Sequence, residues 1–410
     1  MILFLILCVL CGSIMNHREL FFRHLAQTSA APLAFEIVKA EGSLLYDAAG
    51  KEYLDLIGGI SVCNTGHRHP KVTEAIKKQV DDYLHVLVYG ELVQSPQVLY
   101  AQLLTSHLPA SLNSVYFTNS GAEATEGAMK LAKRVTKRTG IVAFKNSYHG
   151  STQGALSIIG DEYWRNAYRP LLPGIRHLDY NQFDALHEID RDTACVIAET
   201  VQAESGILAP SKEWMHALRK KCDETGALLV LDEIQAGFGR TGTLWAFEQF
   251  GIVPDILLLG KALGGGMPLG CFIADQQLMQ QLAENPVLGH ITTFGGHPVS
   301  CAAGMASLQA LLQEGMLNGI QEKEAFFISR LAGPLIREVR SFGLWMAIEF
   351  ESFEINQQVI SRCLERGLLT DWFLFAPQCM RIAPPLVLTG QQIEDACAII
   401  TGSINEVAGA

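Results

Sequence analysis

The sequence lacks an excess of positive charge. Its 410 residues include 31 Lys and Arg but 42 Asp and Glu, which gives a formal net charge of −11. Proteins that bind nucleic acid or an anionic membrane surface favour a basic face. The charge balance therefore argues against both as the main partner, and we expect no nucleic acid and no membrane partner.

Charged residues are few as well, at 18%, whereas 49% of the residues are apolar. This composition is typical of a compact globular protein and argues against a disordered or fibrous one. Repeats and low-complexity segments are missing, and no linker rich in Pro, Gly or Ser divides the chain. Because the length exceeds that of one ordinary domain, we expect two domains with a large core.

The ten cysteines show no metal-binding or disulfide pattern. The one C-x-x-C spacing, Cys8 and Cys11, lies in an apolar leader without metal-ligand partners nearby. Scattered cysteines of this kind are typical of reduced core residues in an intracellular enzyme. We therefore expect a cytoplasmic protein with no metal site.

Residues 1–14, "MILFLILCVLCGSI", form an apolar run that no Lys or Arg precedes. The run is too short to span a bilayer, and small residues suited to cleavage are poorly placed. Met15 then begins a polar, helix-competent sequence. We expect residues 1–14 to lie outside the fold and favour translation from a start at Met15. A true signal peptide is the alternative.

Short apolar runs alternate with amphipathic helical stretches between residues 115 and 275. Near-continuous apolar strands separated by helices indicate a parallel sheet covered on both faces. In such sheets ligands bind outside the carboxyl ends of the strands. The residues that follow each strand are therefore the candidate site. The predicted strands are "SVYF", "IVAF", "CVIAET", "LLVLDE", "DILLLG" and "CFIA".

The first of these strands runs into Asn119, Ser120 and Gly121 and then into a helix. The free amides and the dipole at a helix N-terminus bind phosphate, and glycine lets the backbone approach closely. The same sequence also fits an ordinary capping box, because Ser120 and Glu123 form S-x-x-E. By itself this segment leaves both interpretations open.

Two further strands also end in residues that can serve chemistry. Tyr148 lies in the Gly-bounded loop "KNSYHGST", where its ring can stack on a planar cofactor or simply pack. Glu199 ends "CVIAE", which brings a carboxylate to the same edge, and Glu204 follows five residues later. A solvated turn is the alternative interpretation for Glu204.

The last two strands bring an acid and an amine to this edge. Asp232 ends "LLVLD" and Gln235 follows three residues later, while Lys261 follows "DILLLG" and precedes a glycine run. Desolvation at the end of a buried strand lowers the pKa of a lysine toward nucleophilic use. The alternative is a lysine whose amine reaches the surface.

Phosphate donors, an aromatic ring, carboxylates and an amine together point to one ligand, pyridoxal 5'-phosphate. Its aldehyde reacts with a lysine, its phosphate suits a helix N-terminus, its ring needs a stacking face and its pyridine nitrogen an acid. Asp232 then has a role, because a carboxylate beside the ring nitrogen keeps that nitrogen protonated.

The sequence also resembles a known family, the class-III aminotransferases of the fold-type-I pyridoxal-phosphate enzymes, and especially the acetylornithine/ornithine branch. The resemblance runs from about Leu33 to the C-terminus. It implies an α/β fold with a large domain built on a mostly parallel sheet and a smaller α+β domain. The motifs that carry it are "TNSGAEATEGAMKLA", "SYHGST", "LDEIQAGFGRTG", "LLLGKALGGGMPLG", "TTFGGHP" and "MRIAPPL".

The resemblance implies roles for individual cofactor-binding residues. Lys261 would carry the cofactor as a Schiff base, Asp232 would bind the pyridine nitrogen and Gln235 would lie beside the 3'-oxygen. Tyr148 would stack on the ring. Thr293 would reach the phosphate bound by a neighbouring subunit, which implies a homodimer. Further residues expected to bind the cofactor are Ser120, Gly121 and Ala122 at the phosphate, and Glu199.

The resemblance also implies a division of the chain and a substrate-binding pair. Residues 51–296 would form the large domain, and 15–50 with 297–410 the small one. Arg381 would clamp the substrate α-carboxylate through its two-pronged geometry, with Glu204 as its resting partner. A lone solvated arginine is the alternative interpretation of Arg381.

Two positions depart from the family pattern. His297 replaces the usual Asn, and Ser151 follows "YHG" where ornithine, acetylornithine and 4-aminobutyrate relatives carry an Arg. Because that Arg would hold a second carboxylate, its replacement weakens the expectation of one particular substrate.

The predicted function is transamination, in which an amino group moves from an ω-amine or amino acid to an α-keto acid such as 2-oxoglutarate. A decarboxylase or an aminomutase uses a nearly identical cofactor site, and the sequence separates these activities poorly. A non-catalytic cofactor-binding sensor is a third alternative. It would need a DNA-binding domain, for which the segment before residue 40 is too short and the chain too acidic.

Overall fold

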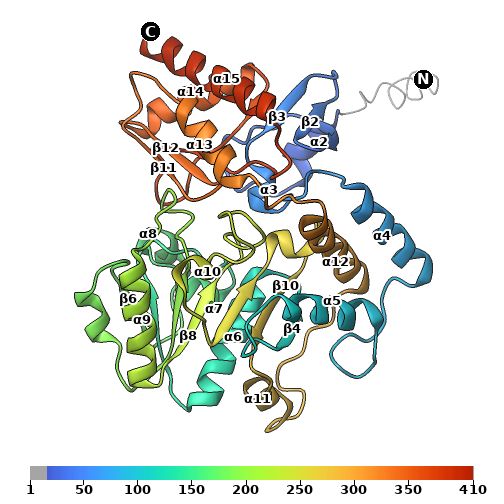
Figure 1. Cartoon of the computed structure of the whole chain (residues 1–410), viewed down its shortest axis with the longest axis vertical. Coiled ribbons are helices and arrows are strands. Elements are labelled where there is room, and N and C mark those ends of the chain that lie inside the picture. The colour runs from blue at the N-terminus through green and yellow to red at the C-terminus, as the bar shows by residue number, and fades with distance from the viewer. Residues whose placement is uncertain (1–15, 410) are drawn as a thin grey trace, which may run out of the picture.

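The structure, a computed structural model, describes residues 16–409 (Figure 1). The expected leader, residues 1–14, lies outside the described residues. The largest sheet has seven strands in the order β4-β10-β9-β8-β7-β5-β6. These strands are β4 (Ser114–Thr118), β5 (Gly140–Phe144), β6 (Ile175–Leu178), β7 (Thr193–Glu199), β8 (Leu228–Asp232), β9 (Ile256–Leu259) and β10 (Gly270–Ala274).

The predicted α/β fold with a mostly parallel sheet is confirmed, since the pairs among β5 to β9 are all parallel. All six apolar runs form strands. β10 runs antiparallel to both β4 and β9, because only a short connection with the helical turn η3 (Lys261–Gly264) separates it from β9. β6 was not predicted, since its sequence "IRHL" places two polar residues in an edge strand.

Helices cover both faces of this sheet (Figure 1). Helix α6 (Gly121–Thr136) packs on β4, β7, β9 and β10, and α9 (Lys212–Thr225) packs on β7 and β8 from the other side. Because side chains alternate along a strand, Ile197, Val230 and Leu258 belong to the core around α6, whereas their sequence neighbours belong to the second core. The polar residues at the strand ends are thus positioned by a sheet whose two faces are buried in hydrophobic cores.

Two smaller sheets complete the fold. Strands β1 (Ile37–Glu41), β2 (Leu44–Asp47), β3 (Glu52–Asp55) and β13 (Leu368–Leu369) form one of them, so segments from both ends of the chain lie together at the top of Figure 1. The other contains β11 (Glu338–Ser341), β12 (Met346–Glu349) and β14 (Cys379–Ile382). β14 carries Arg381. The exact division into domains stays a prediction, and β3, which follows the expected boundary at residue 50, pairs with β2.

The remaining helices lie around these sheets. Helix α12 (Pro298–Gln313) packs against α4 (Pro70–Asp82), α5 (Ser95–Ser106) and η3. Within residues 16–409, no helix has the length and apolar character needed to cross a membrane. The other helices are α2 (His17–His24), α3 (Gly58–Ser61), α7 (Gln153–Ser157), α8 (Glu162–Arg165), η1 (Asn166–Tyr168), η2 (Asp184–Glu188), α10 (Phe247–Phe250), α11 (Gln276–Met279), η4 (Gln280–Ala283), α13 (Ile320–Arg330), α14 (Phe353–Glu365) and α15 (Gly390–Ala408).

Candidate active site

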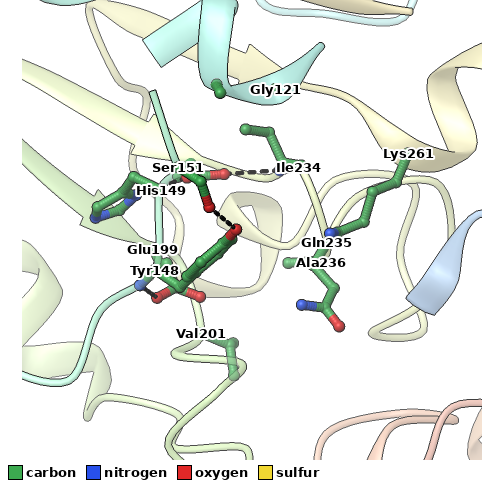
Figure 2. Close-up of a pocket in the computed structure, with 13 residues that line it drawn as sticks. Gly121, Tyr148, His149, Ser151, Glu199, Val201, Ile234, Gln235, Ala236 and Lys261 are labelled. Carbon is green, nitrogen blue, oxygen red and sulfur yellow. Dashed lines mark hydrogen bonds and ion pairs between the residues drawn. The ribbon is translucent and has the colours of Figure 1, made fainter. Parts of the chain in front are cut away.

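A cavity of about 270 Å³ opens at the carboxyl edge of the seven-stranded sheet (Figure 2). Its wall is built from the segments that follow β4, β5, β7, β8 and β9, as the placement of polar residues after these strands predicts. Seven of the expected site residues line it: Gly121, Ala122, Tyr148, Glu199, Asp232, Gln235 and Lys261.

Asp232 is held from two sides at the end of β8. Its Oδ2 accepts a hydrogen bond from Nδ1 of the buried His149 at 2.7 Å, and its Oδ1 accepts the backbone N–H of Ile234 at 2.9 Å. Burial alone would lower the pKa of His149, but the hydrogen bond and charge of Asp232 outweigh it, so this pKa is raised. The carboxylate therefore lines the cavity with a fixed orientation.

Lys261 is the cavity's only lysine and directly follows β9. Its side chain points toward Gln235 and Ala236 in Figure 2. Its backbone φ of +49° lies in the left-handed region, which costs a non-glycine residue free energy and recurs at functional sites. Burial lowers the pKa of Lys261 below its ordinary value, against the opposing charges of Glu204 and Asp232. The amine is thereby biased toward its neutral, nucleophilic form.

Glu199 anchors the loop that carries Tyr148. It pairs in register with Asp232 on the adjacent strand, and its carboxylate accepts the N–H groups of Tyr148 and Ala203, each at 2.9 Å. Burial raises the pKa of Glu199 to about 7, although the charge of His149 opposes this. The other end of the Tyr148 ring is fixed by the 2.9 Å hydrogen bond between its Oη and Oγ of Ser151 (Figure 2).

The N-terminus of α6 presents free backbone donors to the cavity. Ser120 caps the helix, with its Oγ accepting the N–H of Glu123 at 3.2 Å. Among residues 16–409, the amides of Gly121 and Ala122 find no acceptor. A Cβ on Gly121 would lie 2.8 Å from Cδ1 of Ile234, so only glycine fits this position without a shift.

The capping box that the sequence allowed forms only in part. The carboxylate of Glu123 does not return to Ser120 but accepts the backbone N–H of Asn119 at 2.7 Å and its Nδ2 at 2.8 Å. Ser120 therefore caps the helix, while Glu123 ties down the residue before it. Neither interaction uses the amides of Gly121 and Ala122.

Arg381, on β14, lies outside the cavity lining and is almost fully buried. Its Nη1 and Nη2 each donate to one oxygen of Glu204 at 3.0 Å, and its Nε donates to Asp371 at 2.8 Å. Burial would lower the pKa of Arg381, but the charges of both carboxylates raise it. Gln235 links this group to the cavity, because its Oε1 accepts from Nη1 at 3.3 Å. Arg381, Glu204 and Asp371 are called the arginine cluster below.

Thr293 and His297 lie apart from the cavity. Thr293 is exposed, in a segment where Ile291 and Phe294 are also exposed, and it is not among the residues that line the cavity. His297 is the N-cap of α12, with its Nδ1 accepting the N–H of Val299 at 3.3 Å. Because an Asn side chain can cap a helix in the same way, this departure from the family pattern preserves the start of α12.

Two residues of the site were missed from the sequence. His149 lies in the loop "KNSYHGST" that was singled out for Tyr148, but it was not predicted as the partner of Asp232, and Asp371 was not considered at all. The loop "SYHG" carried a signal for His149, since a histidine after a buried strand reaches the same edge as Asp232. Asp371 carried none, because its contact with Arg381 depends on how β14 folds back beside residues 370–372.

The donors in the cavity fit pyridoxal 5'-phosphate. The free amides of Gly121 and Ala122 suit its phosphate. Asp232 offers a carboxylate for a ring nitrogen, and Lys261 an amine for an aldehyde. No group of three or more metal-ligating side chains occurs in the described part of the chain.

Comparisons with known proteins agree with this chemistry. The family model described as "Aminotransferase class-III" matches residues 25–404. The chain is 37% identical to the acetylornithine aminotransferase of Caldanaerobacter subterraneus subsp. tengcongensis, over 90% of this chain and 95% of that protein. It is 38% identical to the acetylornithine aminotransferase of Methanopyrus kandleri, over 95% of this chain and 99% of that protein.

Solved structures give the same result. An ornithine aminotransferase from Toxoplasma gondii superposes with a TM-score of 0.89 at 30% identity and covers 98% of both chains. An (S)-enantioselective omega-transaminase from Thermomicrobium roseum gives 0.87 at 27% identity, over 96% of this chain and 99% of that one. The chain therefore belongs to the class-III aminotransferases, and its cofactor is pyridoxal 5'-phosphate.

Proposed function

We propose that the protein transfers an amino group from an ornithine-like or other ω-amine to an α-keto acid such as 2-oxoglutarate. One observation carries this proposal: the cavity that holds Lys261 and Asp232 is joined through Gln235 to the paired Arg381 and Glu204. The first group suits amine chemistry and the second suits recognition of a carboxylate. The relatives named acetylornithine and ornithine aminotransferases support the same class of substrates.

We assign the cofactor contacts to the residues that line the cavity. The amides of Gly121 and Ala122, with Ser120 as helix cap, would hold the phosphate, and Tyr148 would provide the stacking ring. Gln235 would bind the 3'-oxygen, and Glu199 keeps Tyr148 in place through the backbone N–H that it binds. When bound, pyridoxal 5'-phosphate supplies an electron sink for the charge that develops on the substrate carbon.

Asp232 and Lys261 carry the chemistry of this chain. Asp232, fixed by His149 and by the Ile234 N–H, keeps a proton on the ring nitrogen of the cofactor. Lys261 would act as the general base and acid, because its Nζ would take a proton from the amine-bearing carbon of the donor and, in the other half-reaction, give one to the carbonyl carbon of the keto acid. Its lowered pKa suits this role, since the amine must be neutral to accept the proton.

Arg381 and Glu204 would act as an exchangeable pair. While an ω-amine reacts, Glu204 neutralises Arg381 through both terminal nitrogens. When the α-keto acid enters, its carboxylate takes the place of Glu204 on the same two nitrogens. Bidentate contacts of this kind between an arginine and a carboxylate are strong and directional.

Ser151 narrows the choice of donor. It occupies the position of the family arginine that would hold a distal carboxylate, and its Oγ is engaged with Tyr148. Lys261 is the only lysine, and no arginine lines the cavity. We therefore expect amines without a distal carboxylate to compete well with acetylornithine and ornithine.

The active form would be a homodimer in the cytoplasm. Exposed apolar residues surround Thr293 in its segment, with Val287 73% and Phe294 54% exposed, and Val93 in a second segment is 94% exposed. A subunit interface over these side chains would bury them and bring Thr293 to the partner's phosphate site. The eight cysteines of the described chain are free, which supports a reducing compartment.

Borohydride reduction followed by peptide mapping tests the assignment of Lys261. The treatment fixes the cofactor to the lysine that holds it, and we expect the label on Lys261. A label on any other lysine would contradict the proposal. In parallel, a panel of amines and α-amino acids should be screened for loss of the visible absorbance of the bound cofactor, which identifies the donors directly.

A further inference from the structure

The guanidinium of Arg381 is saturated with acceptors. An arginine has five N–H donors, and each has a partner here. Nη1 and Nη2 give one bond each to Glu204, Nη1 gives a second to Gln235, Nη2 a second to the carbonyl of Trp372, and Nε gives its single bond to Asp371. The two carboxylates therefore occupy different edges of the same group.

These two edges differ in whether a substrate can use them. The Nη1–Nη2 edge faces Glu204, which an incoming carboxylate can replace in the same bidentate geometry. The Nε position faces Asp371, which comes from a different segment of the chain than Glu204. An acceptor that displaces Glu204 therefore leaves the bond between Nε and Asp371 intact.

We propose that Asp371 is a positioning residue that holds Arg381 in orientation while Glu204 and the carboxylate of the α-keto acid exchange. The inference rests on the proposed role of Arg381 and deepens it. Without Asp371, departure of Glu204 would remove both carboxylate partners of the guanidinium at once. With Asp371, the Nη1–Nη2 edge keeps its direction and is ready for the next carboxylate.

Residues 370–373 also contact the backbone of Arg381 and one face of its guanidinium. The backbone N–H of Arg381 donates to the carbonyl of Asp371 at 2.9 Å, and the hydroxyl of Thr370 donates to the carbonyl of Arg381. The ring of Phe373 lies under the guanidinium, with its centroid 4.4 Å from Cζ. The ring covers one face of the guanidinium, while the bond from Nε to Asp371 holds one edge of the group.

Glu204 is held by Leu374 and Phe375, which follow residues 370–373 directly in the chain. Its Oε2 accepts the N–H of Leu374 at 3.0 Å, and its backbone carbonyl accepts the N–H of Phe375, also at 3.0 Å. The side-chain bond breaks when Glu204 leaves Arg381, whereas the backbone bond does not need to break. One short segment thus aligns both members of the exchanging pair.

The charge of Asp371 does not by itself favour one exchanging partner. It opposes Glu204 and the keto-acid carboxylate that replaces Glu204 alike, since each of these two groups brings one negative charge to the Nη1–Nη2 edge. The Asp371 side chain is also 26% exposed, so water screens part of its charge. The effect that remains is the hydrogen bond to Nε, and an uncharged acceptor of the same shape can supply that bond.

Two substitutions separate position from charge. Asp371→Ala removes the acceptor, and we expect the KM for 2-oxoglutarate to rise about tenfold while the donor half-reaction stays within about twofold of wild type. Asp371→Asn keeps an Oδ1 that can accept from Nε, and we expect it to restore most of the KM. Asp190→Ala is the matched control, because Asp190 also accepts from an arginine, Arg176, but outside the arginine cluster.

Three results would overturn the inference. An unchanged KM in Asp371→Ala would show that the bond does not matter, and equal losses in both half-reactions would show a merely structural role. An Asn variant as impaired as the Ala variant would show that charge, not position, is decisive. If the Ala variant fails to fold, Asp371→Ser replaces it, because its hydroxyl is too short to reach Nε.

Arg381→Ala separates failure of this inference from failure of the proposed function. If Arg381→Ala raises the KM for the keto acid and Asp371→Ala does not, only the role of Asp371 is wrong. If neither variant changes that KM, the assignment of Arg381 to the acceptor is wrong as well.

Discussion

The cavity floor, formed by Glu199, Asp232 and Lys261, and the arginine cluster both bury charge, but they hold it by different means. In the floor, backbone amides bind both oxygens of Glu199 and one oxygen of Asp232. In the arginine cluster, the guanidinium is held mainly by the side chains of Glu204 and Asp371. A backbone amide cannot leave its acceptor without moving the chain, whereas a side chain can rotate away. The floor is therefore built to stay fixed and the cluster to exchange.

A second buried arginine shows that burial alone does not mark an exchanging group. Arg240 is fully buried and donates to the carbonyls of Leu344 and Pro384 and to Oδ1 of Asn64. Burial lowers its pKa to about 9, and no carboxylate lies within ion-pair distance in the described chain. Its partners are neutral and mostly backbone, so Arg240 joins segments of the fold and offers no edge to a substrate.

Among the substitutions considered, the largest loss of activity is expected at the cavity floor. Lys261→Ala should slow both half-reactions about 10⁴-fold or more, because the base for the substrate carbon is lost. The variant should still bind pyridoxal 5'-phosphate non-covalently through the α6 amides and Asp232. Rates of the two separate half-reactions measure the effect. Lys323→Ala is the control, since Lys323 is a partly buried lysine bound to the Leu386 carbonyl, and it should be active.

A smaller loss at the floor is expected from Asp232→Asn. The variant should fold and bind cofactor but lose about 10²- to 10³-fold in kcat, because the missing charge matters when the carbanion forms. A kcat near that of wild type would make Asp232 a structural residue only.

The neighbouring carboxylate gives a contrast to this variant. Glu233 accepts the N–H groups of Ala246 and Phe247 and the hydroxyl of Thr200. Glu233→Gln leaves one donor without an acceptor, so it should cost about 1–3 kcal/mol of unfolding free energy. Denaturant titration measures this loss, and the activity of the folded variant should remain.

Substitution of Arg381 should impair mainly the half-reaction of the keto acid. Arg381→Ala removes a charge-assisted carboxylate contact and should raise the KM for 2-oxoglutarate about 10- to 100-fold, which corresponds to about 1.5–3 kcal/mol. Steady-state kinetics with the keto acid varied at saturating donor measures this change. If the KM for the acid is unchanged in this variant, the arginine cluster does not differ in function from the cavity floor in the way proposed.

The smallest change in activity is expected from substitution of Ser151, which lines the cavity. Ser151→Arg should improve kcat/KM for donors with a distal carboxylate, such as acetylornithine, by up to about tenfold. Ser151→Ala, which loses the bond to Tyr148 but adds no charge, should bring no such gain. Efficient, saturable turnover of acetylornithine by the wild-type protein would refute the argument from Ser151.

The floor could be predicted from sequence because strand periodicity locates it. The runs before Glu199, Asp232 and Lys261 are continuously apolar, so these residues had to lie at strand ends, and parallel strands bring their carboxyl ends to one edge. The antiparallel direction of β10 was beyond this reasoning, because a strand's pattern does not encode its direction.

The arginine cluster was predictable only in part. The pair of Arg381 with Glu204 came from a family resemblance, since the two residues lie 177 positions apart. Asp371 lies ten residues before Arg381 and reaches it because the chain folds back on β14, which no local pattern reports. The contribution of Thr293 across a subunit interface stays a prediction.

The division between floor and cluster is tested most directly by stopped-flow measurement of the two half-reactions in Asp232→Asn and Arg381→Ala, at subsaturating substrate. We expect Asp232→Asn to slow the donor and acceptor half-reactions by similar factors. We expect Arg381→Ala to slow the acceptor half-reaction about 10- to 100-fold and the donor half-reaction much less. Equal losses in both half-reactions for Arg381→Ala would show that Arg381 does not act specifically on the keto acid.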